Sequence, residues 1–153
     1  MFGWNKKKKV LLTKEEQQVV LSAIKTAERT TSGEVRVFVE AQCPHLNAVD
    51  RASEIFFKLK MDRTQYRNGT LVYVALNDKQ MAVFADEAIY NKVGDNSYWE
   101  NELILMRDFF KRNEIANGIA QCVLDIGKAL STYFPYDNKT DKNELPDDIV
   151  FGA

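Results

Sequence analysis

The chain has 153 residues, of which 45% are hydrophobic, and this is the size of one ordinary domain that buries roughly two thirds of its unfolded surface. Its 21 basic and 22 acidic side chains nearly cancel, so the overall charge does not indicate nucleic-acid binding. Two cysteines, Cys43 and Cys122, are too few for a disulfide framework or a four-ligand zinc site and predict reduced thiols in a cytoplasmic protein. No run of about 18 uncharged apolar residues occurs, so no transmembrane segment is predicted.

Residues 1–12 are predicted to form a basic N-terminal arm ahead of the folded domain. Lys6 to Lys9 supply the charge, and the short apolar run that follows is far too small for the core of a signal peptide. We expect this arm to be solvated; the alternative is peripheral contact between its lysines and an anionic membrane surface. The domain is predicted to span residues 13–135, followed by an acidic, mobile tail over residues 136–153.

A helix, a strand and a second helix are predicted for the first part of the domain. Residues 13–16 fit a capping box, and apolar residues then recur at helical spacing to about residue 29. From Glu34, valines alternate with other residues, which is typical of a strand with one face better buried than the other. Apolar residues return to helical spacing over residues 48–61, which indicates an amphipathic helix.

Two continuous apolar runs, residues 71–76 and 81–85, are typical of strands that are covered on both faces. Residues 77–79 between them are too few for a helix and predict an antiparallel hairpin. The strand, helix, strand order ahead of the hairpin makes the strands that start at Glu34 and Thr70 parallel, with a right-handed connection.

Two longer helices are predicted downstream. Residues 97–100 fit a second capping box for a helix that runs to about residue 112, and a last helix follows over residues 115–134. Gly118 and Gly127 in the last helix each cost roughly 1 kcal/mol relative to Ala, which predicts close packing against a neighbour. The whole pattern predicts an α/β fold, a three-layer α/β/α sandwich with a small mixed central sheet.

Strand direction brings four oxygen-bearing side chains to one end of the predicted sheet. We call these the rim residues: Glu34, Asn68, Asp86 and Glu87. Their carboxylate and amide oxygens are hard ligands, which suit Ca²⁺ or Mg²⁺ rather than zinc or copper. The alternative is structural, with Asp86 and Glu87 supplying the acidic first turn of a short helix and Glu34 merely solvated.

Asp78 lies at the opposite end of the hairpin, about 20 Å away at roughly 3.3 Å per residue, so it is a candidate for a second, separate metal site. Cys43 and His45 share that end, where ligands of open α/β sheets tend to bind. Asp78 is equally an ordinary turn residue. A thiolate and base pair of Cys43 and His45 lacks a third orienting group, and His45 is expected to be a surface loop residue.

Four stretches together resemble the TPM domain family, most closely its compact soluble bacterial branch. They are residues 31–40, 67–79, 85–89 and 118–127, and the resemblance covers about residues 13–135. It implies an α/β/α fold with a small central sheet and binding of divalent cations. One plant member of the family is described as an acid phosphatase, which implies a phosphatase-like activity in part of the family.

The chain departs from the family pattern at residues 85–88, which read Ala-Asp-Glu-Ala, where relatives commonly place glycines around the acidic residue. Side chains there make a close backbone approach to a phosphate harder. We therefore predict a domain that binds Ca²⁺ or Mg²⁺ through the rim residues, with Asp78 as a second site and no assured catalysis. One alternative is a metal-dependent phosphatase in which Arg36 and Arg67 face the phosphate. Another is an adaptor that docks on a membrane-protein assembly through the lysine arm.

Overall fold

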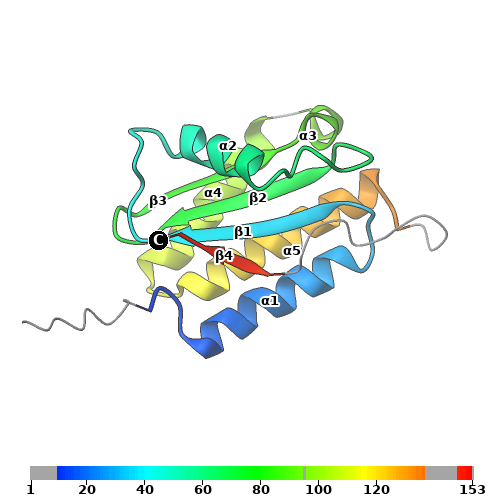
Figure 1. The fold of residues 1–153 in the computed structure, drawn as a ribbon. Coiled ribbons are helices and arrows are strands. Elements are labelled where there is room, and N and C mark those ends of the chain that lie inside the picture. The colour runs from blue at the N-terminus through cyan, green and yellow to red at the C-terminus, as the bar shows by residue number, and fades with distance from the viewer. Residues whose placement is uncertain (1–9, 95, 137–147, 153) are drawn as a thin grey trace, which may run out of the picture.

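The computed structural model describes residues 10–94, 96–136 and 148–152. Within these ranges the chain forms a four-stranded sheet and five helices (Figure 1). The helices are α1 (Lys14–Glu28), α2 (Ala48–Lys58), α3 (Glu87–Val93), α4 (Asn96–Lys111) and α5 (Ile115–Tyr133). The strands are β1 (Glu34–Glu40), β2 (Gly69–Ala75), β3 (Gln80–Ala85) and β4 (Ile149–Phe151).

The sheet is mixed, and its strand order is β3-β2-β1-β4. β1 and β2 are parallel and start level with each other, with Glu34 beside Gly69. β3 returns antiparallel to β2 and places Ala85 beside Thr70. The predicted parallel crossover and the predicted antiparallel hairpin are therefore both confirmed.

Helices cover both faces of the sheet, which confirms the predicted α/β/α sandwich. Figure 1 shows α1 and α5 side by side beneath one face, with α2 across the other. The valines of β1 pack with α1, α4 and α5, whereas Phe38 on the same strand packs with α2. The alternation of side chains along each strand thus divides the core into two apolar clusters, one on each face of the sheet.

Capping and packing explain where the helices begin and how closely they lie. Thr13 Oγ1 accepts from Glu16 N at 3.1 Å while Glu16 Oε1 accepts from Thr13 N at 2.9 Å, which is the predicted capping box of α1. The second predicted capping box is wrong, because α4 already begins at Asn96 and Ser97 lies inside its first turn. The close packing predicted at Gly118 and Gly127 is confirmed, since a Cβ at either glycine would lie within 3.0 Å of a neighbouring helix.

The folded domain begins earlier than predicted. Leu12 was placed in the solvated arm, but it is 2% exposed and packs in the cluster beneath the sheet. Burial of this one large apolar side chain anchors the residues just ahead of α1. Lys6 to Lys9, on which the predicted arm and its membrane contact rest, lie outside the described residues.

The predicted mobile tail is corrected at its far end, because β4 pairs in parallel with β1 and aligns Ile149 with Val37. The β-branched and aromatic residues of β4 suit the otherwise open edge of β1. Asp148 ahead of the strand binds Arg36 across the sheet at 2.9 Å. The rest of the predicted tail, residues 137–147 and 153, lies outside the described residues.

None of the helices in the described ranges is long and apolar enough to cross a membrane.

Candidate cation site at the amino end of the sheet

The starts of β1 and β2 and the end of β3 meet at one rim of the sheet. Glu34 N donates to Asn68 O at 3.4 Å, and Asp86 N donates to Gly69 O at 2.9 Å. The backbone of Asn68 and Gly69 therefore lies between the two acidic residues. Glu34, Asn68 and Asp86 are 2%, 0% and 4% exposed. The strand pairing confirms the predicted convergence of these chain segments, since β1 and β2 start level with each other and β3 ends beside the start of β2.

Asp86 is bound by Arg67 through both arms of the guanidinium group. Nε donates to Oδ2 and Nη2 donates to Oδ1, each at 2.8 Å. Nη1 of the same arginine lies 3.4 Å from Glu87 Oε1. Two-pronged pairs of this kind are the strong form of an ion pair. The hydrogen bond with Asp86 raises the pKa of Arg67, so its positive charge persists at every physiological pH.

Asp86 also begins α3. Its Oδ1 accepts from Glu87 N at 2.8 Å, its backbone is extended, and its carbonyl oxygen accepts from Tyr90 N at 3.0 Å. Asp86 is therefore the N-cap of the helix, with Glu87 in the first turn, where negative charge is favoured. The expected place of these two residues at the start of a short helix is confirmed, and the side chain of Glu87 is 66% exposed. The expectation that Glu34 is merely solvated is wrong, because Glu34 is 2% exposed.

Two buried oxygen atoms beside this ion pair have no hydrogen-bond partner among the described residues. They are Asn68 Oδ1 and Thr70 Oγ1, and both residues are 0% exposed. Asn68 Nδ2 does have a partner, Ser32 Oγ at 3.4 Å, so one half of the amide is satisfied and the other is not. Buried polar atoms are almost always paired, and an exception calls for an explanation such as an ion.

The rim residues fit a hard cation in chemistry but are not grouped as a ready-made metal centre. Among the residues that the structure describes, no three His, Cys, Asp or Glu side chains are close enough together to hold a metal ion. The oxygens at the rim are carboxylate and amide oxygens, the ligands of Ca²⁺ and Mg²⁺, and no thiolate or imidazole is among them. Arg67 meanwhile holds the carboxylates of Asp86 and Glu87.

The opposite end of the sheet has a different arrangement. Asp78 is exposed, and its Oδ2 accepts from Cys43 N at 2.6 Å, which ties the hairpin turn to the loop after β1. Cys43 Sγ donates to His45 O at 3.3 Å, and the imidazole Nε2 of His45 lies 3.3 Å from Glu54 Oε1. The thiol and the imidazole are thus not paired as nucleophile and base. His45 is exposed, as expected of a surface loop residue.

A buried network at this same end was missed from the sequence. Glu40 is 4% exposed and accepts from Nε and Nη2 of Arg51, each at 2.9 Å, and from the hydroxyl of Tyr73. Burial acts to raise the pKa of Glu40, but the hydrogen bonds from Arg51 and Tyr73 outweigh it and hold that pKa below its usual value. Strand alternation assigned Glu40 to the less buried face. The signal that could have found the pair is the position of Arg51 on α2, three residues after Ala48 and four before Ile55, both of which are buried.

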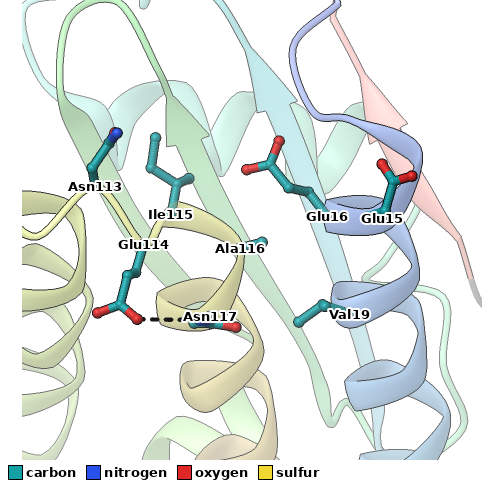
Figure 2. Close-up of a pocket in the computed structure, with 8 residues that line it drawn as sticks. All are labelled: Glu15, Glu16, Val19, Asn113, Glu114, Ile115, Ala116 and Asn117. Atoms are coloured by element: carbon teal, nitrogen blue, oxygen red, sulfur yellow. Dashed lines mark hydrogen bonds between the residues drawn. The ribbon is translucent and has the colours of Figure 1, made fainter.

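A shallow pocket of about 250 Å³ lies between the first turn of α1 and the turn that leads into α5 (Figure 2). Of its three carboxylates, which belong to Glu15, Glu16 and Glu114, two have local partners. Glu16 belongs to the capping box of α1, and Glu114 contacts Arg112 at 3.3 Å and Asn117 at 3.4 Å. None of the rim residues lines this pocket, and neither does Asp78.

Comparisons with known proteins agree with the architecture. The family model described as the TPM domain matches residues 6–129. The NMR structure of the BA42 protein from the psychrophilic bacterium Bizionia argentinensis is similar to this chain, with a TM-score of 0.84 and 36% sequence identity over 95% of this chain and 99% of that one. A comparison with curated proteins found no match. Because the family model matches well over half of the sequence, the chain belongs to the TPM domain family.

Proposed function

We propose that this chain is a divalent-cation-binding domain without assured catalysis and that Ca²⁺ or Mg²⁺ binds at the rim residues. The observation that carries the proposal is the buried amide oxygen of Asn68, which has no hydrogen-bond partner among the described residues. An unpaired buried acceptor costs about 1–3 kcal/mol, and a cation bound to that oxygen would remove the cost. Asn68 lies directly between the strand ends that carry Glu34 and Asp86.

The local charge supports the proposal in a second way. The carboxylates of Asp86 and Glu87 both contact one positive group, the guanidinium of Arg67, which shows that their combined negative charge favours a positive group at this position. Carboxylates held together repel one another, and a positive charge between them relieves the repulsion. The exposed carboxylate of Glu87 gives an ion in solution a route of entry.

The phosphatase alternative ranks second on the same geometry. Its substrate would need Arg36 or Arg67 as a positive partner, and each guanidinium is engaged by a carboxylate, Asp148 in one case and Asp86 in the other. A phosphoryl group would therefore have to displace an intramolecular anion before it could bind. The adaptor alternative rests on the lysine arm and stays a prediction.

Calorimetric titration with CaCl₂ and with MgCl₂ tests the proposal on the natural chain and two matched variants. Asp86→Asn keeps a good helix N-cap but removes the charge, so we expect a loss of affinity of at least about tenfold, or about 1.4 kcal/mol. Asp78→Asn makes the same chemical change at the opposite end of the sheet, at the separate second site predicted there, and we expect it to leave binding at the rim residues as in the natural chain. Equal affinity in all three proteins, or a loss confined to Asp78→Asn, would contradict the assignment.

A further inference from the structure

The proposed cation site already holds a positive group, and this has a consequence for how an ion would bind. We propose that Arg67 competes with the divalent cation for the same carboxylates. Its guanidinium must release Asp86 and Glu87 before the ion can bind there. The inference rests on the proposed function, because it describes how that same site is regulated. It makes Arg67, which is not a ligand, the residue that sets the concentration of ion at which the rim is filled.

The hydrogen bonds of Asp86 leave no room for both cations. Its Oδ2 accepts from Arg67 Nε, and its Oδ1 accepts from Arg67 Nη2 and from Glu87 N, all at 2.8 Å. The guanidinium of Arg67 therefore covers the open side of the Asp86 carboxylate. Ca²⁺ would need that same side, at about 2.3–2.6 Å from the oxygens. A guanidinium and a divalent ion at adjacent positions would also repel each other. Binding of one excludes the other.

The side chain of Arg67 is free to move away from this site, whereas the side chain of Asp86 is held in place. The Arg67 side chain is 40% exposed, so its guanidinium can rotate into solvent. The side chain of Asp86 is 4% exposed and is fixed as the N-cap of α3. The backbone of Arg67 stays in place during the exchange, because its carbonyl oxygen accepts from Ala88 N at 3.1 Å. Release of the site thus needs a side-chain rotation alone.

A second arginine in the same molecule, Arg51, binds a carboxylate with the same two-pronged geometry but is more deeply buried. Arg51 binds Glu40 with two hydrogen bonds of 2.9 Å and also contacts Glu54, as Arg67 does with Asp86 and Glu87. The Arg51 side chain, however, is only 17% exposed, and Glu40 is held in addition by the hydroxyl of Tyr73. Within the described part of the chain, no side-chain oxygen of Glu40 is a buried acceptor without a partner, whereas Asn68 Oδ1, beside Arg67, is one. Arg51 is therefore the matched control.

The experiment compares the natural chain with Arg67→Gln and Arg51→Gln, using calorimetric titration with CaCl₂ and thermal unfolding with and without the ion. We expect Arg67→Gln to bind Ca²⁺ at least about tenfold more tightly than the natural chain, within the usual range of coupling between competing ligands. Its melting temperature should also rise more on adding Ca²⁺, because the ion replaces the missing charge. Arg51→Gln should bind as the natural chain does.

The outcomes separate the inference from the proposed function. Equal or weaker binding by Arg67→Gln, when the natural chain binds, overturns the competition and leaves the cation site standing. Binding by Arg67→Gln alone supports the competition and refutes cation binding by the natural chain. Absence of binding in both proteins overturns both statements.

A measurement on the natural chain covers the case in which Arg67→Gln does not fold. The Nε–Hε signal of Arg67 should move toward its solvent-exposed position as Ca²⁺ is added to saturation, whereas that of Arg51 should stay unchanged. An Arg67 signal that does not move at saturation overturns the inference.

Discussion

At the scale of single residues, burial changes the chemistry of a carboxyl group that was not singled out in the sequence. Glu102 on α4 is 8% exposed and faces α5. Burial raises its pKa to about 8, with the nearby carboxylate of Asp125 as the next cause. The groups around it on α5 and α4 are Cys122 and Tyr98, and the Tyr98 hydroxyl donates to Asp125 O at 3.0 Å. A single glutamate on an amphipathic helix gives no sequence signal of this kind.

The raised pKa of Glu102 predicts that the protein loses stability as pH rises. The folded state holds the Glu102 proton more tightly than the unfolded state, so the stabilisation is complete below an ordinary pKa near 4.5 and is lost as pH rises through about 8. We expect the free energy of unfolding to fall by up to about 4 kcal/mol between those limits. Glu102→Gln, which stays neutral, should lose much less.

Denaturant unfolding at pH 5, 7 and 9 measures this effect, with Glu100→Gln as the control because Glu100 is exposed on the same helix. If the free energies of unfolding of the natural chain and of Glu102→Gln change by the same amount across the three pH values, the assignment of the proton to Glu102 is refuted.

At the scale of elements, α5 is the helix against which α1 and α4 pack, and a glycine sets its distance from α1. An added Cβ at Gly127 would lie 2.6 Å from Ala27 Cβ and 2.8 Å from Ala27 Cα, too close for the two backbones to remain where they are. The sequence showed this packing through the cost of a glycine inside a helix. It could not show which helix came close, because that depends on the order of the layers.

Gly127→Ala therefore has two opposing effects on the free energy of unfolding. The substitution gains about 1 kcal/mol of helix propensity and loses about 1–3 kcal/mol to overpacking against α1. We expect a net decrease in the free energy of unfolding, measured by urea titration. Lys128→Ala, at the exposed neighbouring position, should change stability by no more than about 0.5 kcal/mol. A stabilised Gly127→Ala would show that the α1 and α5 contact yields easily.

At the scale of the whole molecule, chain direction is what brings the rim residues together. Connection length predicted that β1 and β2 run parallel and that β3 returns, and from this followed the shared rim of Glu34, Asn68 and Asp86. The bonds of those side chains could not be predicted in the same way. The fork of Arg67 depends on a left-handed backbone at that residue, with φ of 52°, which no periodicity records. β4 was missed because three residues after a long acidic stretch carry too little pattern.

Locating the ion itself tests the central claim of cation binding at the rim. Mn²⁺ can replace Mg²⁺ at oxygen sites, and its unpaired electrons broaden the NMR signals of nearby amides. Added in small amounts to ¹⁵N-labelled protein, it should first broaden the amides of Asn68, Gly69 and residues 86–88, while those of residues 77–79 at the far end of the hairpin stay sharp. Broadening that begins at residues 77–79 or around Glu15 and Glu114, with the rim amides unaffected, would contradict the account.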